Sequence, residues 1–75
     1  MDDLDRVEFL VEAKQTVKKS LSIKWEWLCK ITREANAVGA EPVLAIEIKG
    51  GQEDLLVDRD WVAIPLRVFE RMKRT

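Results

Sequence analysis

The feature that most constrains the fold is a change of hydrophobic period along the chain, from two residues to between three and four and back to two. Residues 6–14 alternate in polarity, which predicts a strand with two distinct faces. One face carries Val7, Phe9, Val11 and Ala13, and the other carries Glu8, Leu10, Glu12 and Lys14. We expect the Ala13 face to point into the core.

The period of a helix follows over residues 23–38, after a polar, basic loop. Its apolar stripe consists of Trp25, Leu28, Ile31 or Thr32, Ala35 and Val38. Ser22 is the expected N-cap, because its hydroxyl can accept a hydrogen bond from a free amide of the first turn. Gly39 is expected to end the helix.

The period of a strand returns at residues 43–49, and Gly50-Gly51 predicts a tight reversal with positive φ angles. The returning strand is expected at residues 55–57 and 61–64, with a bulge or a short turn between the two parts. Pro65 then opens a terminal helix at residues 66–74, with Leu66, Phe69 and Met72 inward.

These elements give the order β-α-β-β-α and predict an α/β fold with a small mixed sheet. The helical crossover favours parallel first and second strands, and the hairpin adds an antiparallel neighbour. The 75 residues suit one domain, with an acidic tip at residues 1–5 and a core at residues 6–75.

The composition excludes several classes of protein. The chain has no histidine and a single cysteine, Cys29, which argues against zinc sites, Ser-His-Asp catalysis and an internal disulfide. The formal net charge of −1 gives no overall attraction to nucleic acid, so any such binding needs a local basic patch. No apolar run approaches the roughly 20 residues that span a bilayer, and the acidic start is unlike a secretory signal, so we expect a cytoplasmic, intracellular protein without membrane contact.

Glu12 and Lys14 are the candidate catalytic residues. A carboxylate is a ligand that Mg²⁺ prefers, and a lysine two residues further along the same face can orient water or neutralise charge on phosphorus. The same spacing recurs at Glu47 and Lys49, so one of the two pairs is incidental. We favour Glu12, because it precedes a basic loop that leads to a helix. The alternative is that Glu12 and Lys14 form a solvated strand face.

Four segments together resemble the C-terminal part of small phage Holliday-junction-resolvase-like proteins of the PD-(D/E)XK nuclease superfamily. They are LVEAKQT at residues 10–16, KSLSIKWEWL at 19–28, GAEPVL at 39–44 and DWVAIPL at 60–66. The resemblance implies a restriction-endonuclease-like core, a divalent metal (Mg²⁺ or Mn²⁺) and hydrolysis of phosphodiester bonds in branched DNA. By position it makes Glu12 the metal ligand and Lys14 the catalytic lysine.

The family's N-terminal helix and strands, which carry a second metal-binding acid, have no counterpart before residue 6. Asp5 lies seven positions before Glu12, about 23 Å away in a continuous strand. Three explanations stay open: a truncated nuclease, an assembly in which another chain completes the site, or a non-catalytic dimeric module that binds DNA or a partner. An unpaired sheet edge would favour a homodimer or a higher oligomer.

The residues expected to bind nucleic acid lie after Lys14 and are Thr16, Lys18, Lys19, Ser20, Ser22 and Lys24. Lys30 and Arg33 extend this basic region, although the same cations are equally typical of a solvated loop and helix. We expect Trp25 and Trp61 to pack in the core, and Trp27 to be the exposed aromatic residue.

Overall fold

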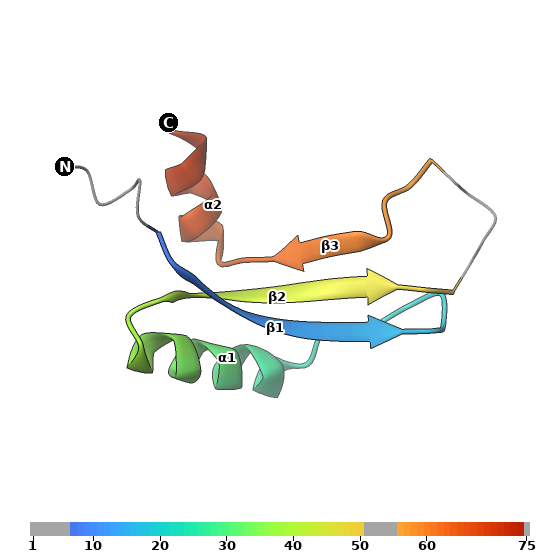
Figure 1. Cartoon of the computed structure of the whole chain (residues 1–75), viewed down its shortest axis with the longest axis horizontal. Helices are drawn as coiled ribbons and strands as arrows, with labels where there is room; N and C mark the ends of the chain where they lie inside the picture. Colours follow the sequence, from blue (N-terminus) through green and yellow to red (C-terminus); the bar gives the residue numbers. More distant parts are fainter. Residues whose placement is uncertain (1–6, 51–55, 75) are drawn as a thin grey trace.

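The computed structural model describes residues 7–50 and 56–74. Along these the elements are β1 (Phe9–Thr16), α1 (Trp25–Ala37), β2 (Glu41–Ile48), β3 (Asp60–Ala63) and α2 (Leu66–Lys73) (Figure 1). The predicted order β-α-β-β-α and the small mixed α/β architecture are confirmed. Within the described residues, neither helix has the length or the apolar sequence needed to cross a membrane.

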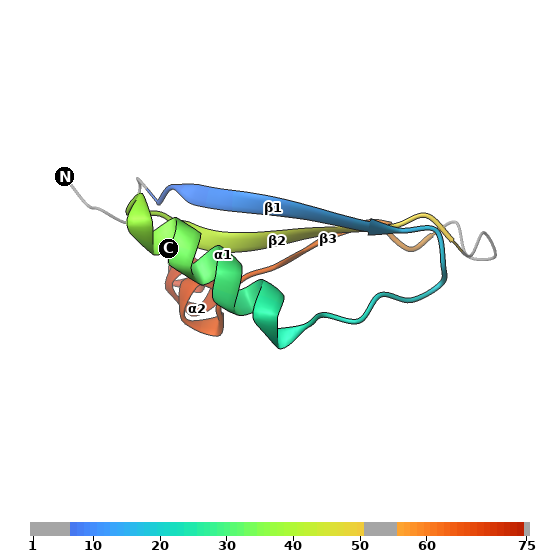
Figure 2. The ribbon, with the colours of Figure 1, turned by 90° about the horizontal axis from the view of Figure 1, so that it is seen from below.

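The sheet has the strand order β1-β2-β3. β1 pairs parallel with β2, so that Glu12 lies beside Leu44, and β3 pairs antiparallel with the other edge of β2. The helix α1 makes the crossover between the two parallel strands and runs along one face of the sheet (Figure 2). Both strand pairings agree with the prediction.

The expected core face of β1 is wrong. Phe9 and Val11 are 40% and 57% exposed and Ala13 is also exposed, whereas Leu10, Glu12 and Lys14 are half-buried beneath α1. The reason lies in β2, whose Leu44 is only 1% exposed and shares the α1 face with Glu12. Because β2 supplies the apolar surface under the helix, the facing side of β1 can carry charge.

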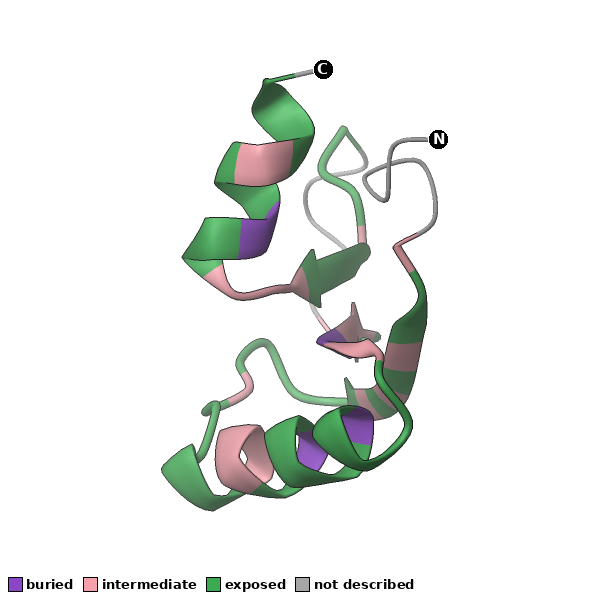
Figure 3. Cartoon of the chain, turned by 90° about the vertical axis from the view of Figure 1, so that its left-hand side faces the viewer, coloured by how far each residue is buried: buried purple, intermediate pink, exposed green. Residues whose placement is uncertain are grey.

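The buried residues form a small core, shown in purple in Figure 3: Ile31, Ala35, Pro42, Val43, Leu44 and Val68. In α1, Ile31 and Ala35 confirm the middle of the predicted stripe. Trp25, however, is the first residue of the helix and is 75% exposed. The expectation that Trp25 packs in the core is therefore wrong.

The two ends of α1 differ in how well the sequence predicts them. The N-cap is Lys24, without a side-chain hydrogen bond, and Ser22 lies in the preceding loop, so the predicted Ser22 cap is wrong. At the other end Gly39 has φ +72°, and the amides of Gly39 and Ala40 donate to the carbonyls of Asn36 and Ala35. This pair of bonds is a Schellman motif and confirms that Gly39 ends the helix.

The return from β2 differs from the expected hairpin. Gly50 lacks the positive φ, which within the described residues belongs to Gly39 alone. A side chain at Gly50 would collide with the backbone of Val17 and Lys18, so close approach of the β1 and β2 ends explains this glycine. Leu56 and Val57 lie in a turn outside β3, contrary to prediction, while Gly51 and Leu55 fall outside the described residues.

The terminal helix begins after Pro65 as predicted, but it buries a different residue. Val68 is the buried side chain of α2, whereas the expected inward residues Leu66, Phe69 and Met72 are exposed. The helix α2 has only eight residues and lies at the β3 side of the sheet, where it contacts little apolar surface. It therefore buries one side chain and not a full apolar stripe. Met72 nevertheless helps to line a shallow hollow with Phe9, Val11, Val43, Val62 and Ile64.

Candidate functional site

Glu12 and Lys14 lie side by side on the α1-facing side of β1. A strand places residues i and i+2 on the same face, and the Lys14 Nζ is 3.1 Å from Oε2 of Glu12. Their side chains are 21% and 29% exposed, respectively. The two residues are thus held together at a partly covered position, accessible to water from one side.

The helix α1 adds a second cation to this carboxylate. Lys30 Nζ is 3.4 Å from Oε1 of Glu12, and it also lies 3.9 Å from Glu34, one turn further along the helix. Each oxygen of Glu12 therefore has its own ammonium partner. Lys14 and Lys30 come from different elements, so this contact joins the strand to the helix.

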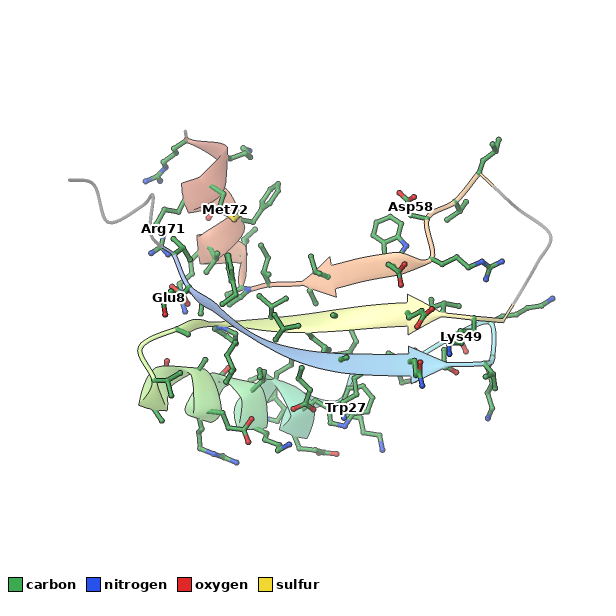
Figure 4. The ribbon with its side chains drawn as sticks, in the orientation of Figure 1. Glu8, Trp27, Lys49, Asp58, Arg71 and Met72 are labelled. Carbon is green, nitrogen blue, oxygen red and sulfur yellow. The ribbon has the colours of Figure 1, made fainter. Side chains whose placement is uncertain are left out.

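Trp27 belongs to the first turn of α1, and its side chain lies below β1 in the view of Figure 4. The Lys14 ammonium lies 4.4 Å from the centroid of its ring, and the Lys24 ammonium lies 5.8 Å away. Both distances are within the range of a cation–π interaction. Trp27 is half-buried in this position, whereas Trp25 and Trp61 are exposed, so the expected roles of the three tryptophans are reversed.

The lysines around Glu12 determine its ionisation. The hydrogen bond from Lys14 lowers the pKa of Glu12, the contact with Lys30 acts in the same direction, and partial desolvation opposes them. The group is a carboxylate at neutral pH. The cluster of Glu12, Lys14, Lys24, Trp27 and Lys30 contains three ammonium groups and one carboxylate, which gives it a local surplus of positive charge.

Such a cluster can attract an anionic ligand, and lysines with an aromatic ring are a combination that nucleic-acid-binding proteins use, the lysines for phosphates and the ring for bases. A divalent cation, by contrast, must compete with Lys14 and Lys30 for the two carboxylate oxygens. The arrangement suits a phosphate with its metal, which brings charge of both signs. It suits a bare metal ion less well.

The residues predicted to bind nucleic acid are placed in two groups. Lys24 joins the cluster through Trp27. Thr16 ends β1, and its hydroxyl accepts a hydrogen bond of 3.1 Å from the Lys18 amide. Lys18, Lys19, Ser20 and Ser22 follow in the exposed loop that leads back to α1 (Figure 2).

Sequence reasoning missed Lys30 as a partner of Glu12, although it included Lys30 among the basic residues. The available signal is helical spacing, because Trp27, Lys30 and Glu34 are three and four residues apart and therefore share one side of α1. That side borders the buried positions Ile31 and Ala35. A charged residue there is well placed to reach the neighbouring strand.

Among the described residues, no group of three His, Cys, Asp or Glu side chains is close enough to hold a metal ion. Glu34 is the acid that shares the Lys30 ammonium with Glu12. Glu47 lies beside Gln15, on the sheet face opposite Glu12. Asp2, Asp3 and Asp5 lie outside the described residues.

A separate charged cluster fastens α2 to the start of β2. Arg67 donates two hydrogen bonds of 2.8 Å to the two oxygens of Glu41, and Arg71 donates a third of 3.2 Å. The side chain of Glu41 is largely covered, and the Arg67 contact is the largest cause of its lowered pKa. The geometry gives these arginines a role in holding α2 in place.

Comparison with known proteins adds no relative: no family model, no curated protein and no solved structure matches the chain.

Proposed function

We propose that the chain is the core of a divalent-metal-dependent DNA endonuclease with a restriction-endonuclease-like fold. Its substrate is branched DNA of the Holliday-junction type, and it works as a homodimer or higher oligomer in the cytoplasm, encoded by a phage or prophage. Glu12 is the ligand of Mg²⁺ or Mn²⁺, and Lys14 is the catalytic lysine. The second acidic ligand comes from outside the described residues.

The observation that carries this proposal is the joint placement of Glu12 and Lys14. They lie 3.1 Å apart on a half-buried strand face, and the loop and helix that follow bring lysines to the same region. A carboxylate can hold a metal, and a neighbouring lysine can stabilise charge on a phosphate during hydrolysis. Substrate phosphate would supply the metal with the remaining oxygen ligands.

A second candidate function is a DNA-binding or interaction module without catalysis. The observation in its favour is that both oxygens of Glu12 already have lysine partners, at 3.1 and 3.4 Å. In that case the carboxylate organises Lys14 and Lys30 as a phosphate-binding pair. The same surface then binds DNA without cutting it.

Lys30 offers a sharp test between the two functions. In a metal site, Lys30→Met frees Oε1 of Glu12 and removes a repelling charge, so Mn²⁺ should bind more tightly. The measurement is calorimetric or paramagnetic titration with Mn²⁺, beside cleavage of a labelled four-way junction with Mg²⁺ or Mn²⁺. Glu12→Gln should abolish both metal binding and cleavage, and Lys14→Met should abolish cleavage while leaving metal bound.

The matched control is Arg33→Met, which removes a cation from an exposed position of the same helix. It should leave Mn²⁺ affinity unchanged. If neither the parent nor Lys30→Met binds Mn²⁺ or cleaves the junction, the endonuclease proposal fails for this chain. Retained junction binding in the same samples would support the non-catalytic module.

A further inference from the structure

The outer edge of β1 has no neighbouring strand among the described residues. The sheet order puts β1 at one end, and its other edge is fully paired with β2 over eight residues. The strand contains neither proline nor a bulge that would disrupt further pairing. It is therefore a long, regular edge that can accept another strand.

The backbone bonds show which groups point outward. The carbonyls of Glu8 and Thr16 accept hydrogen bonds from the Glu41 and Lys49 amides on the β2 side. Because backbone groups alternate along a strand, the even-numbered residues of β1 serve the pairing with β2. The odd-numbered residues between them, which are Phe9, Val11, Ala13 and Gln15, direct their amides and carbonyls to the open edge.

We propose that this edge binds the β1 strand of a second copy of the chain, antiparallel and centred on Ala13, to form a continuous six-stranded sheet. The inference rests on the self-association included in the proposed function and adds its edge, direction and register. A twofold axis perpendicular to the sheet makes such an isologous contact, since it preserves the faces and reverses the strand. Each residue then lies opposite a residue on the same face of the sheet, so the numbers of the two residues are both odd or both even.

Charge selects the register among those centred on the middle of the strand. Centring on Glu12 places the two Glu12 side chains opposite each other, and centring on Lys14 does the same for lysine. Centring on Ala13 places Glu12 opposite the second copy's Lys14, and Lys14 opposite its Glu12. Opposite charges across a strand pair are stabilising, whereas like charges are destabilising.

The Ala13 register also fits the backbone. Glu12 and Lys14 fall at pairs without mutual hydrogen bonds, where the Cα atoms approach to about 4.5 Å. Val17 follows the last residue of β1, so the paired segment runs from Leu10 to Thr16 and leaves Phe9 at each end of the contact. The pairs on the face away from α1 are Val11 with Gln15, and Ala13 with itself.

The first test blocks the edge with proline. Ala13→Pro removes an outward amide and should convert a dimer into a monomer in sedimentation equilibrium, while circular dichroism reports that the fold is kept. Val62→Pro is the matched control. The Ile48 amide donates a hydrogen bond to the carbonyl of Arg59, which lies directly opposite it in the antiparallel pair. Because hydrogen-bonded and non-hydrogen-bonded pairs alternate along the ladder, the amide of Val62 points away from β2. It should leave the dimer intact.

The second test reads the register in the folded protein, in a Cys29→Ser background. A mixture of Val11→Cys and Gln15→Cys chains should form a heterodimer with a short thiol-specific cross-linker, whereas a mixture of Val11→Cys and Ala13→Cys chains should do so far less. The reverse result would overturn the Ala13 register in favour of one centred on Glu12.

A parent chain that stays monomeric at all concentrations would overturn both this inference and the proposed self-association, but not the Glu12–Lys14 site. A dimer that survives Ala13→Pro and gives no Val11–Gln15 cross-link would overturn the β1 contact alone. Metal binding and junction cleavage are measured on separate samples, so their failure counts against the nuclease and not against this edge.

Discussion

The chemical role of Glu12 depends on which side chains contact it. In the sequence it pairs with Lys14 two positions away, and in the fold it also meets Lys30 from α1. The two contacts lower the pKa of the carboxyl and hold it ionised. Whether that carboxylate binds a metal or only organises lysines is decided by the Lys30→Met comparison.

Gly39 is the residue whose backbone sets the clearest stability prediction. Its φ of +72° is unfavourable for a residue with a Cβ, and a Cβ there would meet no atom within 4 Å. Gly39→Ala should therefore destabilise the fold through the backbone alone, by about 1–2 kcal/mol. Denaturant-induced unfolding measures this loss.

Gly39→Asn is the matched comparison, because asparagine tolerates the left-handed conformation better than alanine. It should fall between the parent and Gly39→Ala. Equal unfolding midpoints for the parent and Gly39→Ala would contradict the role given to the Schellman motif.

At the scale of the elements, the two helices depend on the sheet in different ways. The helix α1 buries Ile31 and Ala35 along the sheet, whereas α2 is short and buries only Val68 among its described side chains. The link from Arg67 and Arg71 to Glu41 therefore contributes a large part of what holds α2. This difference predicts that the backbone amides of α2 are less protected from hydrogen exchange than those of α1.

Glu41→Gln should loosen α2 at neutral pH, because it removes the charge that both arginines bind. The folded pKa of Glu41 is lowered, so its stabilising contribution is present above the unfolded pKa and is lost as the pH falls through the folded pKa. Amide hydrogen exchange should show faster exchange over residues 66–73 in the variant. In the parent protein the protection factors of these amides, which correct for the slower intrinsic exchange at low pH, should fall on acidification.

The control for this experiment is Glu70→Gln, which removes an exposed acid of α2 itself. Its exchange should match that of the parent. Unchanged exchange of α2 in Glu41→Gln would show that Val68 and the Pro65 connection are sufficient to hold the helix.

At the scale of the whole molecule, a net charge of −1 leaves DNA attraction to the local distribution of cations. Lys18 and Lys19 lie in the loop at the C-terminal end of β1, whereas α2 lies towards the other end of the sheet (Figure 1). DNA binding at the proposed site should therefore depend on the loop lysines and not on the cations of α2.

The salt dependence of binding tests this distribution. Each lysine that contacts a phosphate contributes about 0.9 to the slope of log affinity against log salt, so the double variant Lys18→Ala, Lys19→Ala should flatten the slope by about 1.8. Fluorescence anisotropy with a labelled four-way junction measures it. The double variant Lys73→Ala, Arg74→Ala removes equal charge from the C-terminal end of the described chain and should leave the slope unchanged; equal flattening by both variants would argue for non-specific attraction.

The local patterns of the sequence determined the order of the elements, the mixed sheet, the end of α1 at Gly39 and the common face of Glu12 and Lys14. Each of these depends on short-range physics: the period of a strand or a helix, and the conformational freedom of glycine at a helix end. These features were predictable because neighbouring residues suffice to specify them.

Only the tertiary structure decided which face of β1 is covered, which tryptophan is sheltered, and which cations reach Glu12 and Glu41. Alternation identifies two faces but does not say which one a helix will cover, and here the apolar side of β2 placed α1 over the charged face of β1. Contacts such as Lys30 with Glu12 and Arg67 with Glu41 join residues 18 and 26 positions apart. These contacts depend on how the packed elements lie against one another, which the local hydrophobic period does not specify.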